Sequence, residues 1–381
     1  MTHAYVLGAK RTPIGSFQGA LARSTAPELG AHAIRAAIEH AGVDGDAVDE
    51  VFMGNVVSAG VRQAPARQAM REAGLPDAIG ATTVNKVCGS GMKAAMLATD
   101  LIRAGSAECV VAGGMESMTN APYLVQKARA GLRMGHGELA DSMFTDGLED
   151  AETGGSMGSF AQDTADEHQL TRAAMDDFAI RSVTKALAAM ESGMLDAEIS
   201  PFGDVTEDEQ PRRSKIDRIP SLRPAFKRDG TITAANASSI SDGASALVIA
   251  GEDAAARAKP LARIVAHATH SIHPAAFTVA PAGAIAKVLD RAGWSKDDVD
   301  VFEINEAFAC VPMMAIDELG LDADKVNLYG GACAQGHPIG STGARLIVTL
   351  THALGATGGR RGVASLCIGG GEATAIALER L

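Results

Sequence analysis

The sequence predicts a layered α/β fold, and three observations support it. Short β-prone runs, among them residues 5–7, 108–112 and 245–250, alternate with alanine-rich helical stretches, which is typical of buried, largely parallel strands covered by helices. Two segments of the chain recur in its second half. The composition, 46% hydrophobic and 21% charged with 42 glycines in 381 residues, is that of a compact globular protein, so disorder and collagen are excluded.

The recurring segments indicate a duplication. Residues 41–49 and 292–300 share an Ala-Gly pair followed by a Val-Asp pair, at an offset of 251 residues. Residues 110–116 and 366–372 share an apolar run, a Gly-Gly pair and a glutamate, at an offset of 256 residues. In the first pair, an acidic stretch leads into an apolar strand. The sequence therefore predicts two related halves.

Between the halves lies a region of different character, rich in Met, Gly and charge clusters. We predict an N-terminal half formed by residues 1–118 with about 240–262, an inserted loop domain at 119–239 and a C-terminal half at 263–381. Seven cations fall within seventeen residues of the insertion: Arg212, Arg213, Lys215, Arg218, Arg223, Lys227 and Arg228. This local excess of positive charge in an otherwise acidic chain favours a phosphate-bearing ligand, and a solvated basic loop is the alternative.

Charge and cysteine content exclude several classes of protein. The net charge of −12 disfavours nucleic acid and anionic lipid as partners. Residues 1–15 show no export signal, and the uncharged runs are too short or too broken to span a bilayer. Five cysteines without a CxxC pair fit free thiols in a reducing compartment. We therefore expect a cytoplasmic protein with no nucleic-acid or membrane partner.

Cys88 is the first candidate for chemistry. It lies in VCGSGMKA, after a β-prone run and directly before an apolar helix. Unpaired backbone N–H groups and the positive end of the helix dipole favour a thiolate there, and Gly89 and Gly91 let other atoms approach the backbone. A free cysteine is more often a small buried hydrophobe, but the Gly-Ser-Gly context weakens that alternative.

His337 is the best candidate for a base that acts on this thiol. It lies among five glycines in residues 330–345, and Pro338 restricts it to extended geometry, so that its ring can be aimed. Cys333 and His337 have a spacing that could bind zinc, but no second pair of ligands accompanies them. We expect no metal.

Three further residues complete the candidate site. Cys367 ends a predicted buried strand that runs into the glycines 369–371, whose backbone N–H groups could form an oxyanion hole. Asn305, in NEAFA, ends the second copy of the repeated strand, where its carboxamide could hold a water or a carbonyl. The alternative role for Asn305 is a helix N-cap.

Together these pieces resemble the thiolase family. VCGSGMKA, AGGMESM, NEAFA, GHPIGSTGAR and CIGGG occur in the family's order, and the similarity covers essentially all 381 residues. The resemblance implies duplicated βαβαβαββ halves in a layered α-β-α-β-α arrangement with an inserted, coenzyme A-binding loop domain. It also implies a homodimeric or homotetrameric acetyl-CoA C-acetyltransferase of fatty acid metabolism, which interconverts two acetyl-CoA with acetoacetyl-CoA plus CoA through an acyl-cysteine. Coenzyme A is then a substrate, and no cofactor is expected.

The resemblance also assigns catalytic roles. Cys88 is the acyl-accepting nucleophile, His337 its base and Cys367 a second acid/base. Asn305, through a water, and His337 form one oxyanion hole, whereas the backbone N–H groups of Cys88 and Gly369 form the other.

The resemblance assigns substrate contacts as well. Arg212 is the expected nucleotide contact, Phe226 lines the coenzyme site and Ser238 touches the pantetheine. Met157 and Phe308 match apolar residues around the acyl group. Phe277 and Ser156 depart from acetoacetyl-specific members, which carry Met and His there, so the acyl chain length stays open.

Four other functions are alternatives to an acetyl-CoA C-acetyltransferase. A 3-ketoacyl-CoA thiolase of longer-chain β-oxidation is the first alternative. Residues 154–158 spell the G-x-S-x-G of a serine hydrolase, but acidic and polar residues precede them instead of a buried strand. A condensing ketosynthase also has a nucleophilic cysteine, but its acid/base residues differ. The second cysteine, in CIGGG, therefore argues against that function. A non-catalytic coenzyme A-binding protein would tolerate loss of Cys88, His337 or Cys367, and all three are present.

Overall fold

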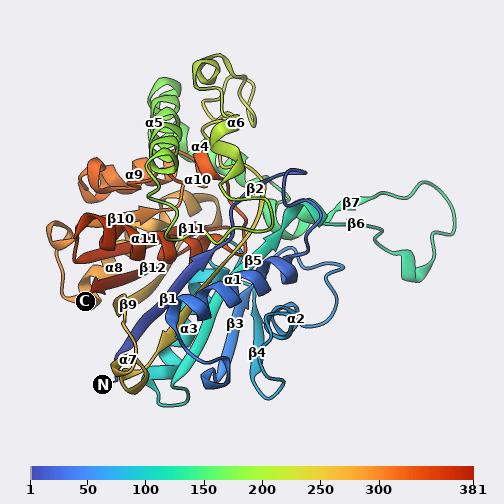
Figure 1. Ribbon diagram of the computed structural model, residues 1–381. Helices are drawn as coiled ribbons and strands as arrows, with labels where there is room; N and C mark the ends of the chain where they lie inside the picture. Colours follow the sequence, from blue (N-terminus) through green and yellow to red (C-terminus); the bar gives the residue numbers. More distant parts are fainter. Residues whose placement is uncertain (1) are drawn as a thin grey trace.

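The computed structural model describes residues 2–381, so Met1, the first residue of the predicted N-terminal half, lies outside the described residues. Its centre is a sheet in the order β10-β11-β12-β9-β1-β8-β5-β3-β4, with β2 paired to β8 (Figure 1). The strands are β1 (Ala4–Arg11), β2 (Gly15–Ser16), β3 (Glu50–Gly54), β4 (Gly80–Val84), β5 (Cys109–Ser117), β8 (Ser241–Ala250), β9 (Ala262–Ser271), β10 (Val301–Ile304), β11 (Arg361–Ile368) and β12 (Glu372–Arg380). A separate pair consists of β6 (Tyr123–Leu124) and β7 (Ala140–Asp141).

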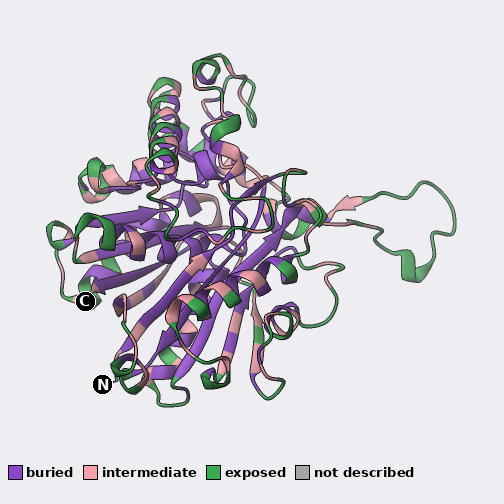
Figure 2. Ribbon diagram, in the orientation of Figure 1, coloured by how far each residue is buried: buried purple, intermediate pink, exposed green. Residues whose placement is uncertain are grey.

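The helices cover this sheet in layers. They are α1 (Ala26–Ala41), α2 (Pro65–Glu72), α3 (Ser90–Arg103), α4 (Met157–Glu167), α5 (Arg172–Glu191), α6 (Glu209–Arg213), α7 (Glu252–Ala256), α8 (Ala280–Ala292), α9 (Cys310–Leu319), α10 (Ala332–Gln335) and α11 (Thr342–Thr357). Helices α3 and α11 share one buried cluster with strands of both halves. Helices α1 and α2 cover the other face of the N-terminal strands, and α8 and α9 cover that of the C-terminal strands. With α3 and α11 packed against strands of both halves and the other helices on the outer faces, this is the predicted α-β-α-β-α layering, and most of the strands are buried (Figure 2).

The structure confirms the duplication and explains the repeated residues. Gly42 and Gly293 both end a helix with φ near +65°, at 64° and 68°, a conformation that favours glycine. The Asp49 carboxylate accepts hydrogen bonds from the backbone N–H groups at the start of β5. The Asp300 carboxylate does the same at the start of β11. The repeat therefore marks equivalent helix ends and strand starts.

The expectation of largely parallel strands is wrong. Parallel pairing is found between β3 and β4, β3 and β5, and β10 and β11, whereas the other pairs of this sheet are antiparallel. In the C-terminal half the reversal follows from the short glycine turn 369–371, because a turn of this length can join only antiparallel neighbours. Fully buried strands lack the alternating polar face that marks many antiparallel sheets, so the sequence did not reveal their direction.

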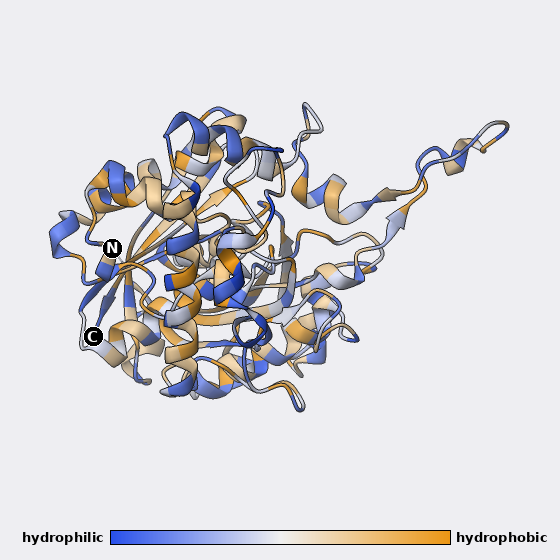
Figure 3. Ribbon diagram, turned by 90° about the horizontal axis from the view of Figure 1, so that it is seen from above, coloured by the Kyte–Doolittle hydropathy of each residue, from blue (hydrophilic) through white to orange (hydrophobic). Residues whose placement is uncertain are grey.

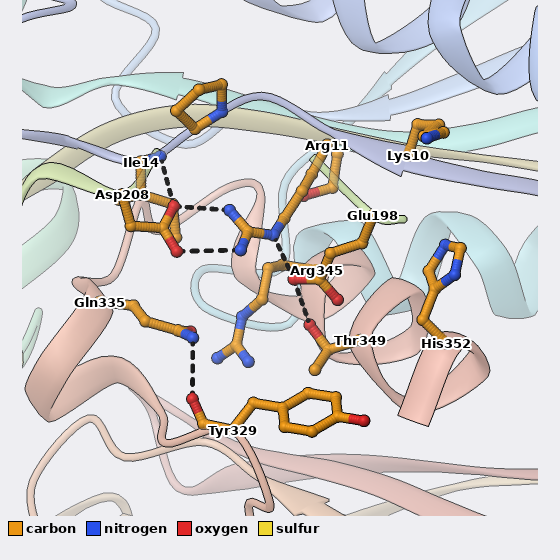
Figure 4. Close-up of polar contacts among 12 residues, drawn as sticks. Lys10, Arg11, Ile14, Glu198, Asp208, Tyr329, Gln335, Arg345, Thr349 and His352 are labelled. Carbon is orange, nitrogen blue, oxygen red and sulfur yellow. Dashed lines mark hydrogen bonds and ion pairs between the residues drawn. The ribbon is translucent and has the colours of Figure 1, made fainter. Parts of the chain in front are cut away.

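Buried ion pairs attach the region between the halves to the sheet. Arg11 of β1 is completely buried, and its guanidinium donates to Glu198 at 2.6 Å and to both oxygens of Asp208 at 2.6 and 2.9 Å (Figure 4). Asp208 also accepts from the Ile14 backbone N–H. Removing one partner would leave an uncompensated buried charge, which costs about 3–5 kcal/mol. The domain boundaries themselves stay a prediction.

Within residues 2–381, no helix combines the length and the apolar character that crossing a bilayer requires.

Candidate active site

A cavity of about 230 Å³ lies where the two halves and the inserted region meet. Eight of the eleven predicted site residues line it: Cys88, Met157, Phe226, Ser238, Phe277, Phe308, His337 and Gly369. The cavity draws on loops that follow parallel-paired strands in both halves of the sheet, β4, paired with β3, in one half and β10 and β11 in the other. Cys88 follows β4, Asn305 follows β10 and Gly369 follows β11.

The turn that carries Cys88 holds an unusual backbone conformation. Val87 has φ +47°, which is rare for a β-branched residue. The Ser90 hydroxyl donates to the Val87 carbonyl at 2.6 Å, and the Val87 N–H donates to the Asn85 side chain at 3.0 Å. Such strain persists only where the surrounding contacts impose it, and it is common at functional sites. The strained Val87 directly precedes Cys88, which lines the cavity two residues before α3 begins.

The hydrogen bonds of His337 define its tautomer. Its Nδ1 lies 2.6 Å from Thr342 Oγ1, and that hydroxyl lies 3.0 Å from the Pro338 carbonyl oxygen. The carbonyl can only accept, so we assign the single hydroxyl proton to it and Nδ1 as the donor to Thr342. Nε2 is therefore the nitrogen with a free lone pair. It is buried and has no hydrogen-bond partner among the described residues, although the ring lines the cavity.

Burial keeps both Cys88 and His337 neutral in the unliganded protein. Burial raises the pKa of the Cys88 thiol to about 11, although the backbone N–H groups of Gly369 and Cys88 itself act to lower it. Burial, and secondly the Arg345 charge, lower the pKa of His337 to about 3. We expected the helix and the imidazole to hold a thiolate, but desolvation outweighs them. The cavity lining therefore holds a neutral thiol and a neutral imidazole whose Nε2 can accept a proton.

Cys367 and Asn305 are buried and do not line the cavity. Cys367 is fully buried in one cluster with Phe277 and Phe308, and its pKa is raised first by burial and next by the neighbouring Cys88 sulfur. Both polar atoms of the Asn305 carboxamide are buried without a partner among residues 2–381. Its helix N-cap alternative is not realised, since Ala309 precedes α9. A buried amide left unpaired by the protein is available to a water or a ligand.

The substrate-binding predictions fall into two groups. Phe308 makes edge-to-face contacts with Phe226, at a centroid distance of 6.0 Å, and with Phe277, at 6.4 Å. These rings, with Met157, give the cavity an apolar lining, and Ser238 lines it as well. Arg212 does not line the cavity; its guanidinium forms two hydrogen bonds with Glu207, at 2.6 and 2.8 Å.

Two buried glutamates that sequence reasoning left unassigned fix the segment around His337. Glu116 accepts from the Gly340 N–H at 2.9 Å, and Glu306 accepts from the Cys333 N–H at 3.1 Å. The close approach of backbones matters here too, because a Cβ on Gly114 would lie 2.0 Å from the Gly340 oxygen. The AGGMESM and NEAFA motifs contained these glutamates, but nothing in the sequence paired them with the His337 segment.

The G-x-S-x-G segment is not a nucleophile elbow. Ser156 is the N-cap of α4, where its hydroxyl accepts from the Ser159 N–H at 3.1 Å, and no strand runs into it. Across residues 2–381, no group of three or more His, Cys, Asp or Glu side chains is placed to hold a metal ion.

Known proteins match this chain over its whole length. Residues 4–253 match the family described as Thiolase, N-terminal domain, and residues 258–380 match Thiolase, C-terminal domain. The chain is 47% identical to an acetyl-CoA acetyltransferase of Pseudomonas aeruginosa and 48% identical to one of Escherichia coli, over 100% of both chains in each case. Its fold is similar to that of the Acat5 thiolase from Ascaris suum, crystallised in complex with coenzyme A, with a TM-score of 0.96, 41% identity and 100% coverage of both chains.

Proposed function

Since the chain belongs to the thiolase family, we propose that it is an acetyl-CoA C-acetyltransferase, which interconverts two acetyl-CoA with acetoacetyl-CoA plus CoA. Relatives with that name match it over its whole length. The longer-chain thiolase alternative is not favoured by these relatives. Coenzyme A and its thioesters are the substrates. The Cys88 thiol and the His337 imidazole in the cavity lining, together with the buried Cys367 thiol near Cys88, supply the groups that the reaction needs.

The first half-reaction transfers an acetyl group to Cys88. His337 Nε2 accepts the thiol proton as the sulfur attacks the thioester carbonyl, and the resulting oxyanion accepts hydrogen bonds from the backbone N–H groups of Cys88 and Gly369. The tetrahedral adduct collapses with cleavage of the carbon–sulfur bond to CoA. The departing CoA thiolate takes the proton of Cys367. Acetyl-Cys88, an imidazolium and a Cys367 thiolate remain.

The second half-reaction forms the carbon–carbon bond. The Cys367 thiolate removes a proton from the α-carbon of a second acetyl-CoA, and the enolate oxygen is stabilised by the imidazolium and by a water held on Asn305. The enolate carbon attacks acetyl-Cys88. The new oxyanion again accepts from the N–H groups of Cys88 and Gly369. Collapse releases acetoacetyl-CoA, and the Cys88 sulfur recovers its proton from His337.

The observation that carries this proposal is the unpaired lone pair of His337 Nε2 in a cavity that Cys88 shares. The test is to incubate the protein with acetyl-CoA and to locate the acetyl adduct by peptide mass spectrometry. We expect it on Cys88, absent in Cys88→Ala and retained in Cys109→Ala, a control thiol in β5. An adduct that persists in Cys88→Ala would overturn the assignment.

We propose that the coenzyme passes Phe226 and Ser238, with Met157, Phe277 and Phe308 around the acyl group; their place in the cavity lining supports this. Arg212 stays the proposed nucleotide contact, and it would have to exchange Glu207 for a phosphate. We expect Arg212→Ala to raise the KM for CoA with little change in kcat. An unchanged KM would transfer this role to the neighbouring cations, such as Lys215 or Arg218.

We also propose a homodimer or homotetramer. The arm, defined as residues 125–139 between β6 and β7, projects away from the body (Figure 1), and hydrophobic residues are interspersed with hydrophilic ones along its ribbon (Figure 3). Met134 is 86% exposed, and Leu132 and Leu139 are exposed as well. Light scattering after size exclusion should give a mass above that of one chain, reduced in Leu132→Asp/Met134→Asp if the arm joins subunits.

A cytoplasmic location is proposed on the chemistry of the cysteines. All five are free, and the mechanism needs Cys88 and Cys367 reduced, which a reducing compartment ensures. Cell fractionation with an antibody against the protein would test the location.

A further inference from the structure

An ion pair connects the two loops that carry the reacting sulfur and the Gly369 N–H. Lys86 Nζ lies 2.5 Å from Glu372 Oε2, and both side chains are largely buried, with 21% and 31% exposed. Glu372 Oε1 also accepts from the Ser271 hydroxyl at 3.2 Å. Lys86 is two residues before Cys88, and Glu372 directly follows the glycine turn 369–371. Among residues 2–381, it is the single ion pair between these two loops.

On the Cys88 side, Lys86 belongs to the backbone frame of the nucleophile turn. Its N–H donates to the Ser90 hydroxyl at 2.8 Å, and its carbonyl accepts from the Gly89 N–H at 3.0 Å. Any movement of Lys86 therefore moves the turn that contains Cys88.

On the other side, Glu372 begins β12 and is the register partner of Ile368, the residue before Gly369. Gly370 and Gly371 have φ of 92° and 84° and no side chains that could fix the turn by packing. The Gly371 carbonyl is held by the Ile272 N–H at 2.7 Å, on the side facing β9. Glu372 supplies the polar attachment on the side facing Cys88.

We propose that the Lys86–Glu372 ion pair is a positioning element, which holds the Gly369 N–H against the Cys88 sulfur and so sets the geometry of the oxyanion hole used in acyl transfer. The inference rests on the proposed function. The two residues touch no reacting atom; they act through the backbone of Cys88 and Gly369. Because an oxyanion hole works only with donors at hydrogen-bond distance from the developing charge, a small displacement of one donor lowers kcat more than it lowers binding.

The test compares Lys86→Met, Glu372→Met, the double variant, Lys86→Arg and the charge swap Lys86→Glu/Glu372→Lys. Thiolysis of acetoacetyl-CoA gives kcat and KM, and thermal unfolding gives Tm. We expect each Met variant to lose about three- to tenfold in kcat with KM within about twofold of wild type. The double variant should lose no more than either single one, because both remove the same contact. Lys86→Arg should restore kcat, and the swap should restore part of it.

Arg263→Met is the matched control. Arg263 of β9 pairs with Glu379 of β12 at 2.5 Å. Ser271 and Glu372 lie at the opposite ends of the same two strands. It should shift Tm as much as the Met variants do while kcat stays at the wild-type value. If Arg263→Met lowers kcat in parallel with Tm, or if the Lys86 and Glu372 losses add, the ion pair has no positioning role and the inference fails.

A second readout separates this inference from the proposed function. The Gly369 N–H favours the thiolate of Cys88, so its displacement should slow alkylation of Cys88 by iodoacetamide at fixed pH. Slower alkylation in both Met variants supports the positioning role even if the wild type shows no thiolysis, in which case the proposed function alone fails. Alkylation and kcat both at wild-type values would overturn the positioning role.

Discussion

The two halves use one scaffold for different tasks. Asp49 and Asp300 bind the starts of equivalent strands in the same way, and Gly42 and Gly293 end equivalent helices. At the carboxyl ends of the strands the halves diverge: the N-terminal half supplies Cys88 and the C-terminal half supplies His337, Cys367 and Asn305.

The buried carboxylates show the same divergence. Glu116 of the N-terminal half and Glu306 of the C-terminal half both bind the His337 segment, one at each end. Neither half could hold that segment alone. The comparison teaches that duplication conserves the contacts that start strands and end helices, whereas the loops at the opposite edge are free to specialise.

The largest expected effect is a loss of kcat when His337, which the C-terminal half supplies, is substituted. His337→Asn removes the base and one oxyanion donor, so we expect kcat for acetoacetyl-CoA thiolysis to fall by at least about 10³-fold. His352→Asn is the control, because His352 binds the Ala9 carbonyl from α11 and faces away from the cavity lining. A His337 variant with near-normal kcat would remove the imidazole from the mechanism.

Asn305 allows a sharper test, because its side-chain carboxamide has no hydrogen-bond partner among the described residues. Asn305→Ala should lower kcat by about 10²-fold through loss of the water-mediated oxyanion contact, with Tm unchanged or raised. Asn327→Ala, by contrast, should reduce the thermal stability of the protein. Asn327 makes buried hydrogen bonds to Ile304 and Glu306, so its loss should lower Tm clearly. If Asn305→Ala instead unfolds the protein, its role is structural.

The pH dependence of Cys88 alkylation tests the neutral resting state. The thiol pKa is raised by burial to about 11, so the thiolate fraction should increase about tenfold per pH unit throughout pH 6–9. The iodoacetamide rate of Cys88 should therefore rise over that whole range without a plateau. A plateau already reached near pH 7 would indicate a preformed thiolate–imidazolium pair and contradict the burial argument.

The smallest expected effect is a loss of stability, and it should be of similar size for equivalent substitutions in the two halves. Asp49→Ala and Asp300→Ala each remove a carboxylate that accepts two backbone N–H groups, and each should cost about 1–3 kcal/mol of unfolding free energy. Denaturant unfolding should give similar losses for both, with wild-type kcat at temperatures where both variants are folded. Clearly unequal losses would mean that the repeat has lost its structural equivalence.

The sequence alone predicted the layered halves and the family, because those signals are local. Motifs such as VCGSGMKA and CIGGG name their own residues, and a repeat at a fixed offset is visible without coordinates. Strand direction was not predictable, since a buried strand has the same composition whichever way it pairs.

Effects that depend on distant neighbours also escaped sequence reasoning. Glu116 binds Gly340, more than two hundred residues away. The burial that raises the pKa of the Cys88 thiol is likewise a property of the folded chain. The Arg212–Glu207 pair, by contrast, joins residues five positions apart, so the local charge pattern could have indicated it. The roles of the eleven site residues therefore stay predictions that the variants above can test.

The tight approach of Gly114 to the Gly340 carbonyl has a consequence for protein engineering. A saturation library scored by growth or turnover would show position 114 as intolerant as position 88, although Gly114 does not line the cavity. Tolerance profiles would therefore mark two kinds of intolerant residue, those that react and those that leave room for a neighbouring backbone. Neither kind can be changed to accept a new acyl group, so such changes belong at the apolar cavity-lining residues Met157, Phe277 and Phe308.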